Sequence, residues 1–98
     1  EEGLKFDAVL ASDDSLAVGA VKYAHTAGIS MPEELSIIGY NNSLLARCTD
    51  PEITSIDSKV EALCTTTVNT LMGVFSGANV PNQTTIASAL IKRKTTNF

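Results

Sequence analysis

The chain has 98 residues, of which 44% are hydrophobic and 18% charged, and its formal net charge is −4. This length predicts one small domain, no apolar segment approaches the ~20 residues of a membrane span, and the acidic balance argues against a nucleic-acid-binding surface, which is usually basic. Cys48 and Cys64 lack metal-ligand spacing, and we expect Cys64 to be a buried thiol rather than part of a disulfide. Residues 1–5 are not typical of a signal peptide.

The first predicted elements are a strand and a helix. Residues 6–11 form a short apolar run bounded by polar residues, which predicts a buried strand. Residues 15–28 carry apolar side chains at three- and four-residue steps, which predicts a helix that Ser12 or Asp13 begins and a glycine, Gly28, ends. Two carboxylates, Asp13 and Asp14, precede this helix. If one of them caps the helix, the other is free to accept hydrogen bonds from a polar ligand.

The next predicted strand ends in a second polar cluster, residues 41–43, near Asp13 and Asp14. A loop at residues 29–34 leads into an apolar, β-branched strand at residues 35–40, and strand, helix and strand in this order form a right-handed βαβ unit. Residues 41–43 then lie at the sheet edge where Asp13 and Asp14 lie, and ligands bind at that edge in open α/β sheets. The Asn41–Asn42 amides both donate and accept, as sugar hydroxyls do, although this dipeptide is also typical of a turn.

The second half of the sequence predicts one short helix, one long helix and two extended segments. The elements expected there are a short helix at 44–48, a turn at 49–52, an extended piece at 53–56, a long helix from about Ser58 to Ser76, a strand at 84–94 and a tail at 95–98. The apolar stripe of the long helix consists of Val60, Leu63, Cys64, Val68, Leu71 and Phe75. These elements make a thin sheet, so we expect part of a larger doubly wound domain.

Catalytic chemistry has little support. A phosphoacceptor site on Asp13 and Asp14 needs a third Asp and a Lys at other strand ends, whereas asparagines follow the second strand. The chain has one histidine, so a Ser-His-Asp triad has no support, and it has no Gly-rich phosphate loop. We expect residues 92–94, a run of three basic residues, to be a solvated strand end. The sequence therefore predicts no catalytic residue, no metal, no cofactor and no enzyme.

Four segments resemble one protein family. Residues 7–20 resemble the segment DAVFAANDLMALGAL of the LacI/GalR family of bacterial transcription repressors, and residues 28–42 resemble its GLRVPEDVSVVGYDD. Residues 50–56 are similar to its PPLTTI, and residues 90–96 to its closing strand. The resemblance covers nearly the whole chain, in the same order and spacing.

This resemblance implies an α/β fold: a parallel-sheet, periplasmic-binding-protein-like lobe that is a fragment of a two-lobed doubly wound domain. Residues 1–98 would be the C-terminal part of the effector-binding domain. Within it, residues 1–57 would form the C-terminal lobe, about 58–85 would cross to the other lobe, and about 86–98 would be the return strand and tail. The operator-binding helix-turn-helix would lie outside this chain.

The resemblance also implies a function. The protein would be a cytoplasmic, homodimeric repressor with no membrane segment, whose affinity for operator DNA changes when a small sugar-like effector binds. Asp13, Asn41 and Ser58 stand at effector-contacting positions, where the common family residues are Asn, Asp and Gln. The implied dimer interface consists of Leu16, Val18, Val21, Lys22, Leu44, Leu45 and Thr49, while Asp14 would be a helix-start residue. The alternative is a periplasmic sugar-binding protein of a transporter, which shares fold and pocket.

Overall fold

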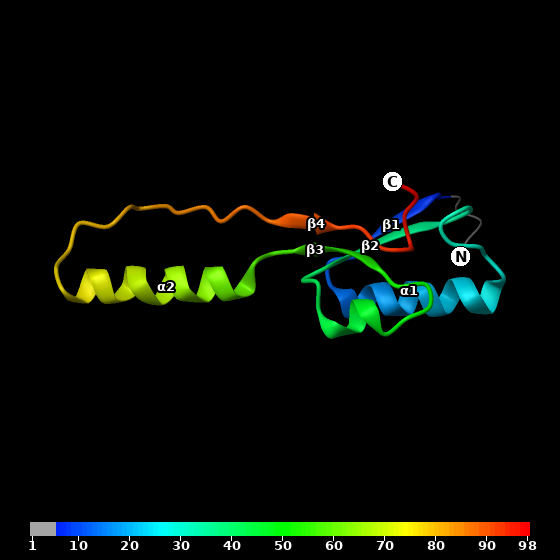
Figure 1. Ribbon diagram of the computed structural model, residues 1–98, viewed down its shortest axis with the longest axis horizontal. Helices are drawn as coiled ribbons and strands as arrows, with labels where there is room; N and C mark the ends of the chain where they lie inside the picture. The colour runs from blue at the N-terminus through cyan, green and yellow to red at the C-terminus, as the bar shows by residue number, and fades with distance from the viewer. Residues whose placement is uncertain (1–5) are drawn as a thin grey trace.

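The computed structural model describes residues 6–98, so the polar residues 1–5 discussed above lie outside the described residues. In chain order the elements are β1 (Ala8–Leu10), α1 (Asp14–Ala27), β2 (Ser36–Tyr40), the 3-10 helix η1 (Leu44–Arg47), β3 (Thr54–Asp57), α2 (Val60–Phe75) and β4 (Ala89–Ile91) (Figure 1). This order agrees with the prediction, but the last strand is much shorter than the predicted 84–94. β3 ends at Asp57, which pairs with Ala89, so residues 84–88 extend past the end of β3 and pair with no strand among residues 6–98.

The four strands form one sheet in the order β1-β2-β3-β4. β1 pairs with β2 and β2 with β3 in parallel, while β4 runs antiparallel to β3. The register places Gly39 beside Ser55 and Ile56 beside Leu90. The predicted α/β fold with a mainly parallel sheet is therefore confirmed, and the carboxyl ends of β1, β2 and β3 meet at one edge.

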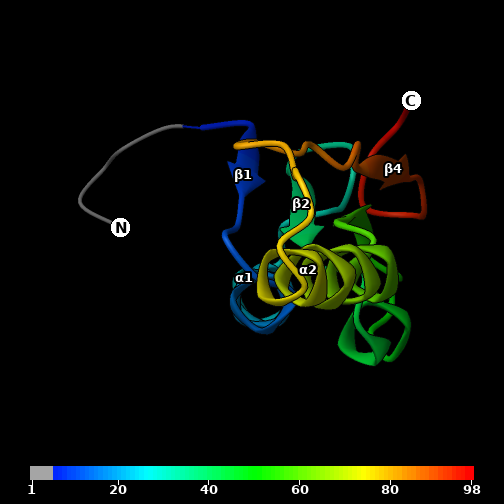
Figure 2. The same ribbon diagram turned by 90° about the vertical axis from the view of Figure 1, so that its left-hand side faces the viewer.

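The core lies between α1 and one face of the sheet (Figure 2). On the helix side, Ala17 and Ala24 are fully buried and Val21 is 2% exposed, and they pack against Ile37 and other buried residues of the sheet side. A Cβ at Gly39 would lie 2.2 Å from the Oδ1 atom of Asp14, so this strand position requires glycine for the helix to approach. Val21, which is predicted at the dimer interface, packs into this core instead of lying on the surface.

The C-terminal residues return into this core. Thr95 is fully buried and Thr96 is 5% exposed. The Thr95 hydroxyl donates to the carbonyl oxygen of Ile37 at 2.6 Å and accepts the Thr54 N–H at 2.9 Å, and the Thr96 and Thr54 hydroxyls lie 2.7 Å apart. The prediction of a tail is wrong for these two residues, since their hydroxyls satisfy buried polar groups of the sheet.

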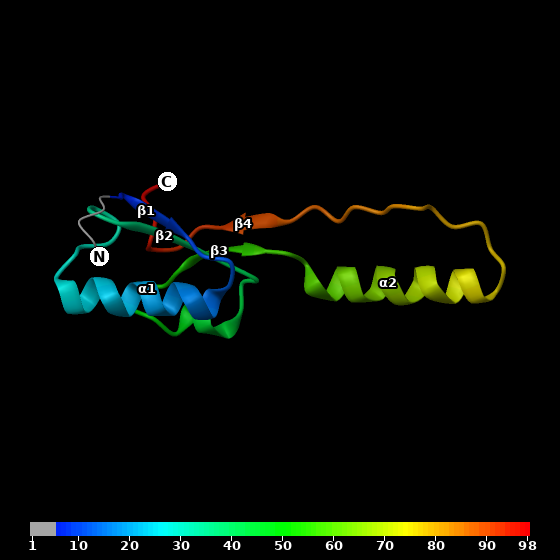
Figure 3. The same cartoon turned by 180° about the vertical axis from the view of Figure 1, so that it is seen from behind.

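α2 and the segment that follows it extend away from the sheet, and that segment runs back beside the helix to β4 (Figures 1 and 3). The described chain measures 59 × 26 × 21 Å, and its radius of gyration is 17.8 Å, whereas about 13 Å is typical of a compact domain of this length. No residue of α2 is buried. Its apolar stripe is therefore uncovered, and Cys64 is exposed rather than buried because no element among residues 6–98 packs over it.

Candidate functional site

Asp13 begins α1 and also reaches the end of the neighbouring strand. Its backbone is extended, with φ −159° and ψ 155°, and its Oδ2 atom accepts the Ser15 N–H at 3.0 Å and the Ser15 hydroxyl at 2.7 Å. This is the N-cap geometry predicted for Ser12 or Asp13. The other oxygen, Oδ1, accepts the Asn41 Nδ2 group at 2.6 Å. One carboxylate thus both caps the helix and takes part in the polar cluster.

Asn41 connects Asp13 to the third strand. Its backbone N–H donates to the carbonyl oxygen of Ile56 at 2.8 Å, and its side-chain oxygen accepts the Ser58 hydroxyl at 3.3 Å. The three residues predicted as effector contacts therefore form a continuous chain of hydrogen bonds across the carboxyl edge of β1, β2 and β3. We call Asp13, Asn41 and Ser58 the edge cluster.

The edge cluster keeps hydrogen-bonding capacity that its internal bonds do not use. A carboxylate oxygen accepts two hydrogen bonds, an amide has two N–H groups and two lone pairs, and a hydroxyl both donates and accepts. Asn41 is exposed, and Asp13 and Ser58 are partly exposed, so a ligand can reach all three. The Ser15 hydroxyl and N–H and the Asn41 amide hold the pKa of Asp13 below its ordinary value of 3.8, so this carboxylate is ionised at neutral pH.

Two hollows adjoin the edge cluster. One, of about 380 Å³, is mainly apolar and is lined by Leu10, Ala11, Ser12, Tyr40 and Ile56, of which Ser12 and Tyr40 directly precede cluster residues in sequence. The other, of about 430 Å³, is lined by Asn41, Asn42, Asp57, Lys59, Val60, Glu61 and Ala62. The site therefore offers an aromatic and aliphatic wall on one side and a polar, mixed-charge wall on the other.

Asp14, the second carboxylate, is the first residue of α1, as predicted, but its oxygens are not free for a ligand. It is fully buried, and it accepts the Ser43 N–H at 2.6 Å, the Ser43 hydroxyl at 2.9 Å and the Ser55 hydroxyl at 2.7 Å. We did not assign Ser55 any role from the sequence. The signal that could have found it is the polar pair Thr54–Ser55 between two isoleucines. Polar side chains buried in a strand need hydrogen-bond partners, so this pair indicates a buried polar contact.

Arg93 corrects the prediction of a solvated basic strand end. Its guanidinium donates to the carbonyl oxygen of Ile53 at 2.8 Å and to the side-chain oxygen of Asn42 at 2.6 Å. The residue is partly buried and links the C-terminal segment to the loop that carries the edge cluster. The sequence holds no signal for this contact, since its partners are 40 and 51 positions away.

The residues predicted for a dimer interface differ in exposure. Leu16 is 60% exposed, Leu44 66% and Leu45 44%. Lys22 is also exposed, whereas Val18 and Thr49 are partly buried, and Val21 is in the core. The exposed members lie on α1 and η1, which are neighbours on the same side of the sheet (Figures 1 and 3). Two neighbouring elements therefore each carry exposed leucine side chains.

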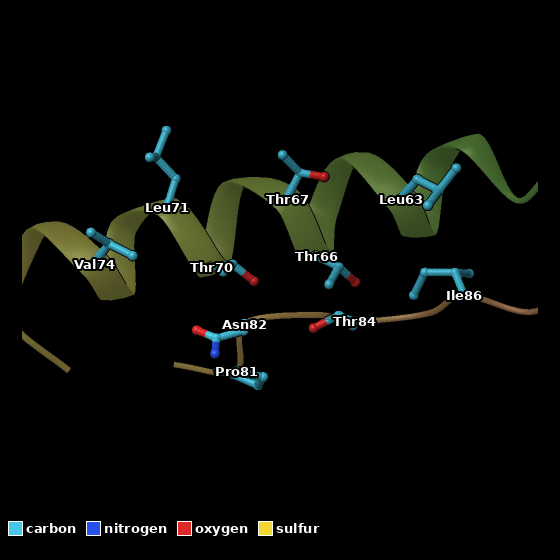
Figure 4. A pocket seen from close by; sticks show the side chains of 10 residues that line it. All are labelled: Leu63, Thr66, Thr67, Thr70, Leu71, Val74, Pro81, Asn82, Thr84 and Ile86. Carbon is cyan, nitrogen blue, oxygen red and sulfur yellow. The ribbon is translucent and has the colours of Figure 1, made fainter. Parts of the chain in front are cut away.

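A separate groove lies between α2 and the segment after it (Figure 4). It has a volume of about 380 Å³, and the residues of the described chain that line it are apolar residues, three threonines of α2, Asn82 and Thr84. It contains no edge-cluster residue. Among the described residues, no three His, Cys, Asp or Glu side chains are grouped as metal ligands, and neither long helix has the length and apolar character needed to cross a bilayer.

Comparison with known proteins identifies the class. The chain belongs to the family of periplasmic binding protein-like domains, whose family model matches residues 2–96. Its relatives within that class are LacI/GalR-type regulators, which confirms the resemblance. An HTH-type transcriptional regulator of Lachnoclostridium phytofermentans is 55% identical over 98 residues, which are 100% of this chain and 29% of the relative.

Solved structures agree with this class. The lac repressor dimer bound to operator and the anti-inducer ONPF has a TM-score of 0.91 at 29% identity, over 97% of this chain and 33% of that one. A periplasmic binding protein/LacI transcriptional regulator of Alkaliphilus metalliredigens, complexed with D-xylulofuranose, has a TM-score of 0.83 at 30% identity, over 95% of this chain and 35% of that one. The chain thus spans about a third of the length of these proteins.

Proposed function

We propose that this chain is the effector-sensing part of a LacI-type transcription repressor and that the edge cluster binds a small, neutral, sugar-like molecule. The observation that carries the proposal is the hydrogen-bonded chain from Asp13 through Asn41 to Ser58. It stands at the carboxyl edge of parallel strands, where α/β sheets bind ligands. The relatives are transcriptional regulators rather than enzymes, and their names favour this function over a transporter component.

The chemistry of the cluster favours hydroxyl groups over phosphates. Alternating acceptor, amide and hydroxyl groups match vicinal hydroxyls, each of which donates and accepts. The ionised Asp13 repels an anion, and Asp57 and Glu61 stand beside Asn41 in the adjoining hollow, where Lys59 is the one cation among the described lining residues. The apolar hollow with Tyr40 suits the C–H face of a sugar ring.

The same placement supports an allosteric mechanism. Ser58 lies where the chain leaves the sheet for α2, so we propose residues 58–85 as the part that crosses to a second lobe and 86–98 as the return. An effector that binds one closure state more tightly shifts the population toward that state. In a homodimer formed partly through Leu16, Lys22, Leu44 and Leu45, this shift would change the spacing of operator-binding heads, which lie outside this chain.

A thermal-shift experiment on the complete protein tests the site. The probes are D-xylose, D-glucose, D-galactose and cellobiose, compared with glucose 6-phosphate and adenine. A ligand that binds only the native state stabilises it by about 2.7 kcal/mol at 100 times its Kd. We expect a neutral sugar to raise Tm by several degrees, Asn41→Ala to abolish the shift, and the exposed control Asn97→Ala to preserve it.

Two results would overturn the proposal. The edge cluster is not the site if Asn41→Ala and Asp13→Ala bind the sugar with the affinity of the unsubstituted protein. The sugar class is wrong if only adenine or the phosphorylated sugar raises Tm. Operator retention in a gel-shift assay, measured with and without the sugar that binds, then tests the regulatory part.

A further inference from the structure

The turn that carries Asn41, the middle residue of the edge cluster, has an uncommon backbone conformation. Asn41 and Asn42 both have positive φ, 95° and 49°, although neither is glycine. Asparagine adopts this left-handed region more readily than other non-glycine residues, but two in succession are still uncommon and depend on surrounding contacts. The direction of the Asn41 side chain depends on this turn, because its backbone geometry orients the Cα–Cβ bond.

Asp14 holds the residue that follows the turn. Its Oδ2 atom accepts both the N–H and the hydroxyl of Ser43. Hydrogen bonds to a charged acceptor are about twice as strong as neutral ones, and the accepting Asp14 side chain is fully buried. The position of Ser43 relative to the start of α1 is therefore fixed.

Asp14 also stabilises the turn through Ser55 of β3. Its Oδ1 atom accepts the Ser55 hydroxyl, and the Ser55 oxygen in turn accepts the Asn42 N–H at 2.9 Å. Since the hydroxyl proton points to the carboxylate, the lone pairs of Ser55 are directed to the Asn42 N–H. Asp14 therefore orients both Ser55, which accepts the Asn42 N–H, and Ser43, the residue after Asn42. The Arg93 guanidinium donates to the side-chain oxygen of Asn42.

We propose that Asp14 is a positioning residue of the effector site: its buried carboxylate fixes the left-handed Asn41–Asn42 turn and so aims the Asn41 amide at Asp13 and Ser58. Asp14 does not touch the ligand. The nearly isosteric Asp14→Asn replaces one acceptor oxygen with an NH₂ group, so the side chain can no longer accept from all three donors. The inference rests on the proposed function only for its consequence on sugar affinity.

Amide hydrogen exchange of the complete, ligand-free protein tests the positioning role directly. In Asp14→Asn we expect the amides of residues 42–43 to exchange at least about tenfold faster, while those of residues 17–27 in α1 are unchanged. Glu34→Gln is the matched control, because Glu34 accepts the N–H and hydroxyl of Ser30 in the same way but is exposed and remote from the turn. Glu34→Gln should leave the amide exchange rates of residues 42–43 unchanged.

The outcomes separate positioning from plain structural support. Unchanged exchange at residues 42–43, or equally faster exchange throughout α1, would overturn the proposal. If Asp14→Asn does not fold, Ser55→Ala, which removes the acceptor of the Asn42 N–H, must loosen the same amides. For any probe sugar that binds, Asp14→Asn should raise Kd about tenfold. If none binds, the sugar proposal fails, while the exchange result still decides the role of Asp14.

Discussion

Thr95→Val isolates the contribution of two buried hydrogen bonds. Valine keeps the volume of threonine but removes the hydroxyl that donates to the Ile37 carbonyl at 2.6 Å and accepts the Thr54 N–H at 2.9 Å. Each buried polar group left without its partner costs about 1–3 kcal/mol, so the two groups together predict a loss of about 2–6 kcal/mol. At the roughly 2–4 °C per kcal/mol typical of a domain of 150–250 residues, this lowers Tm by roughly 4–24 °C.

Thermal denaturation of the complete protein, followed by circular dichroism, measures this effect. Thr95→Ser is the matched variant, because it keeps the hydroxyl and loses only a methyl group, at a cost of about 1 kcal/mol. The exposed Thr26→Val in α1 should stay within about 0.5 kcal/mol. We expect Tm to be highest for the wild type, lower for Thr95→Ser and lowest for Thr95→Val. If Thr95→Val melts at or above Thr95→Ser, the hydroxyl does not stabilise the core and the reasoning is refuted.

Three further predictions concern the groups around the site. Gly39→Ala places a Cβ 2.2 Å from Asp14 Oδ1 and should lower stability by about 1–3 kcal/mol in thermal denaturation. Arg93→Lys keeps the charge but loses the fork that binds two oxygens, so the urea midpoint should fall by the equivalent of about 1–2 kcal/mol. The pKa of Asp13 lies below 3.8, so its hydrogen bonds contribute fully above that pH and are lost as pH falls through the lowered pKa. In a series of Tm measurements from pH 6 to pH 2.5, Asp13→Asn should therefore lose less stability on acidification than the wild type.

Each of these predictions has a control or a contrary outcome. Gly19→Ala is the control for the first, since Gly19 lies on the exposed face of α1 with no atom near the new methyl group, and it should stabilise by about 0.5–1 kcal/mol. An unchanged urea midpoint in Arg93→Lys would mean that one of the two guanidinium contacts contributes nothing. Parallel acid profiles for Asp13→Asn and wild type would show that the Asp13 carboxylate does not link folding to pH.

Much of the fold follows from local signals in the sequence. The strand, helix and strand of residues 6–40 were predicted from periodicity, and Gly28 ends α1 in the left-handed conformation as expected, with φ 72°. The convergence of Asp13 and Asn41 followed from a rule about parallel strands, and the structure brings them within 2.6 Å. The family resemblance added Ser58, which lies between β3 and α2 and has no local signal of its own.

The errors concern side chains whose surroundings come from distant parts of the chain. Thr95 and Thr96 have the composition of a polar tail, yet they are buried because their hydroxyls meet strand residues 41 to 58 positions earlier. For Cys64 the apolar stripe indicated burial, but exposure depends on which element covers that face, and none does among the described residues.

The sequence by itself determined the elements, their order, the parallel edge and the polar residues that gather there, because periodicity, capping and turn chemistry act over a few residues. Only the tertiary structure decided the different roles of Asp13 and Asp14. These neighbouring carboxylates have the same local propensities, but one lies at the exposed end of α1 and the other faces the sheet. Their partners, Asn41 for one and Ser43 with Ser55 for the other, are set by the packing of α1 on the sheet.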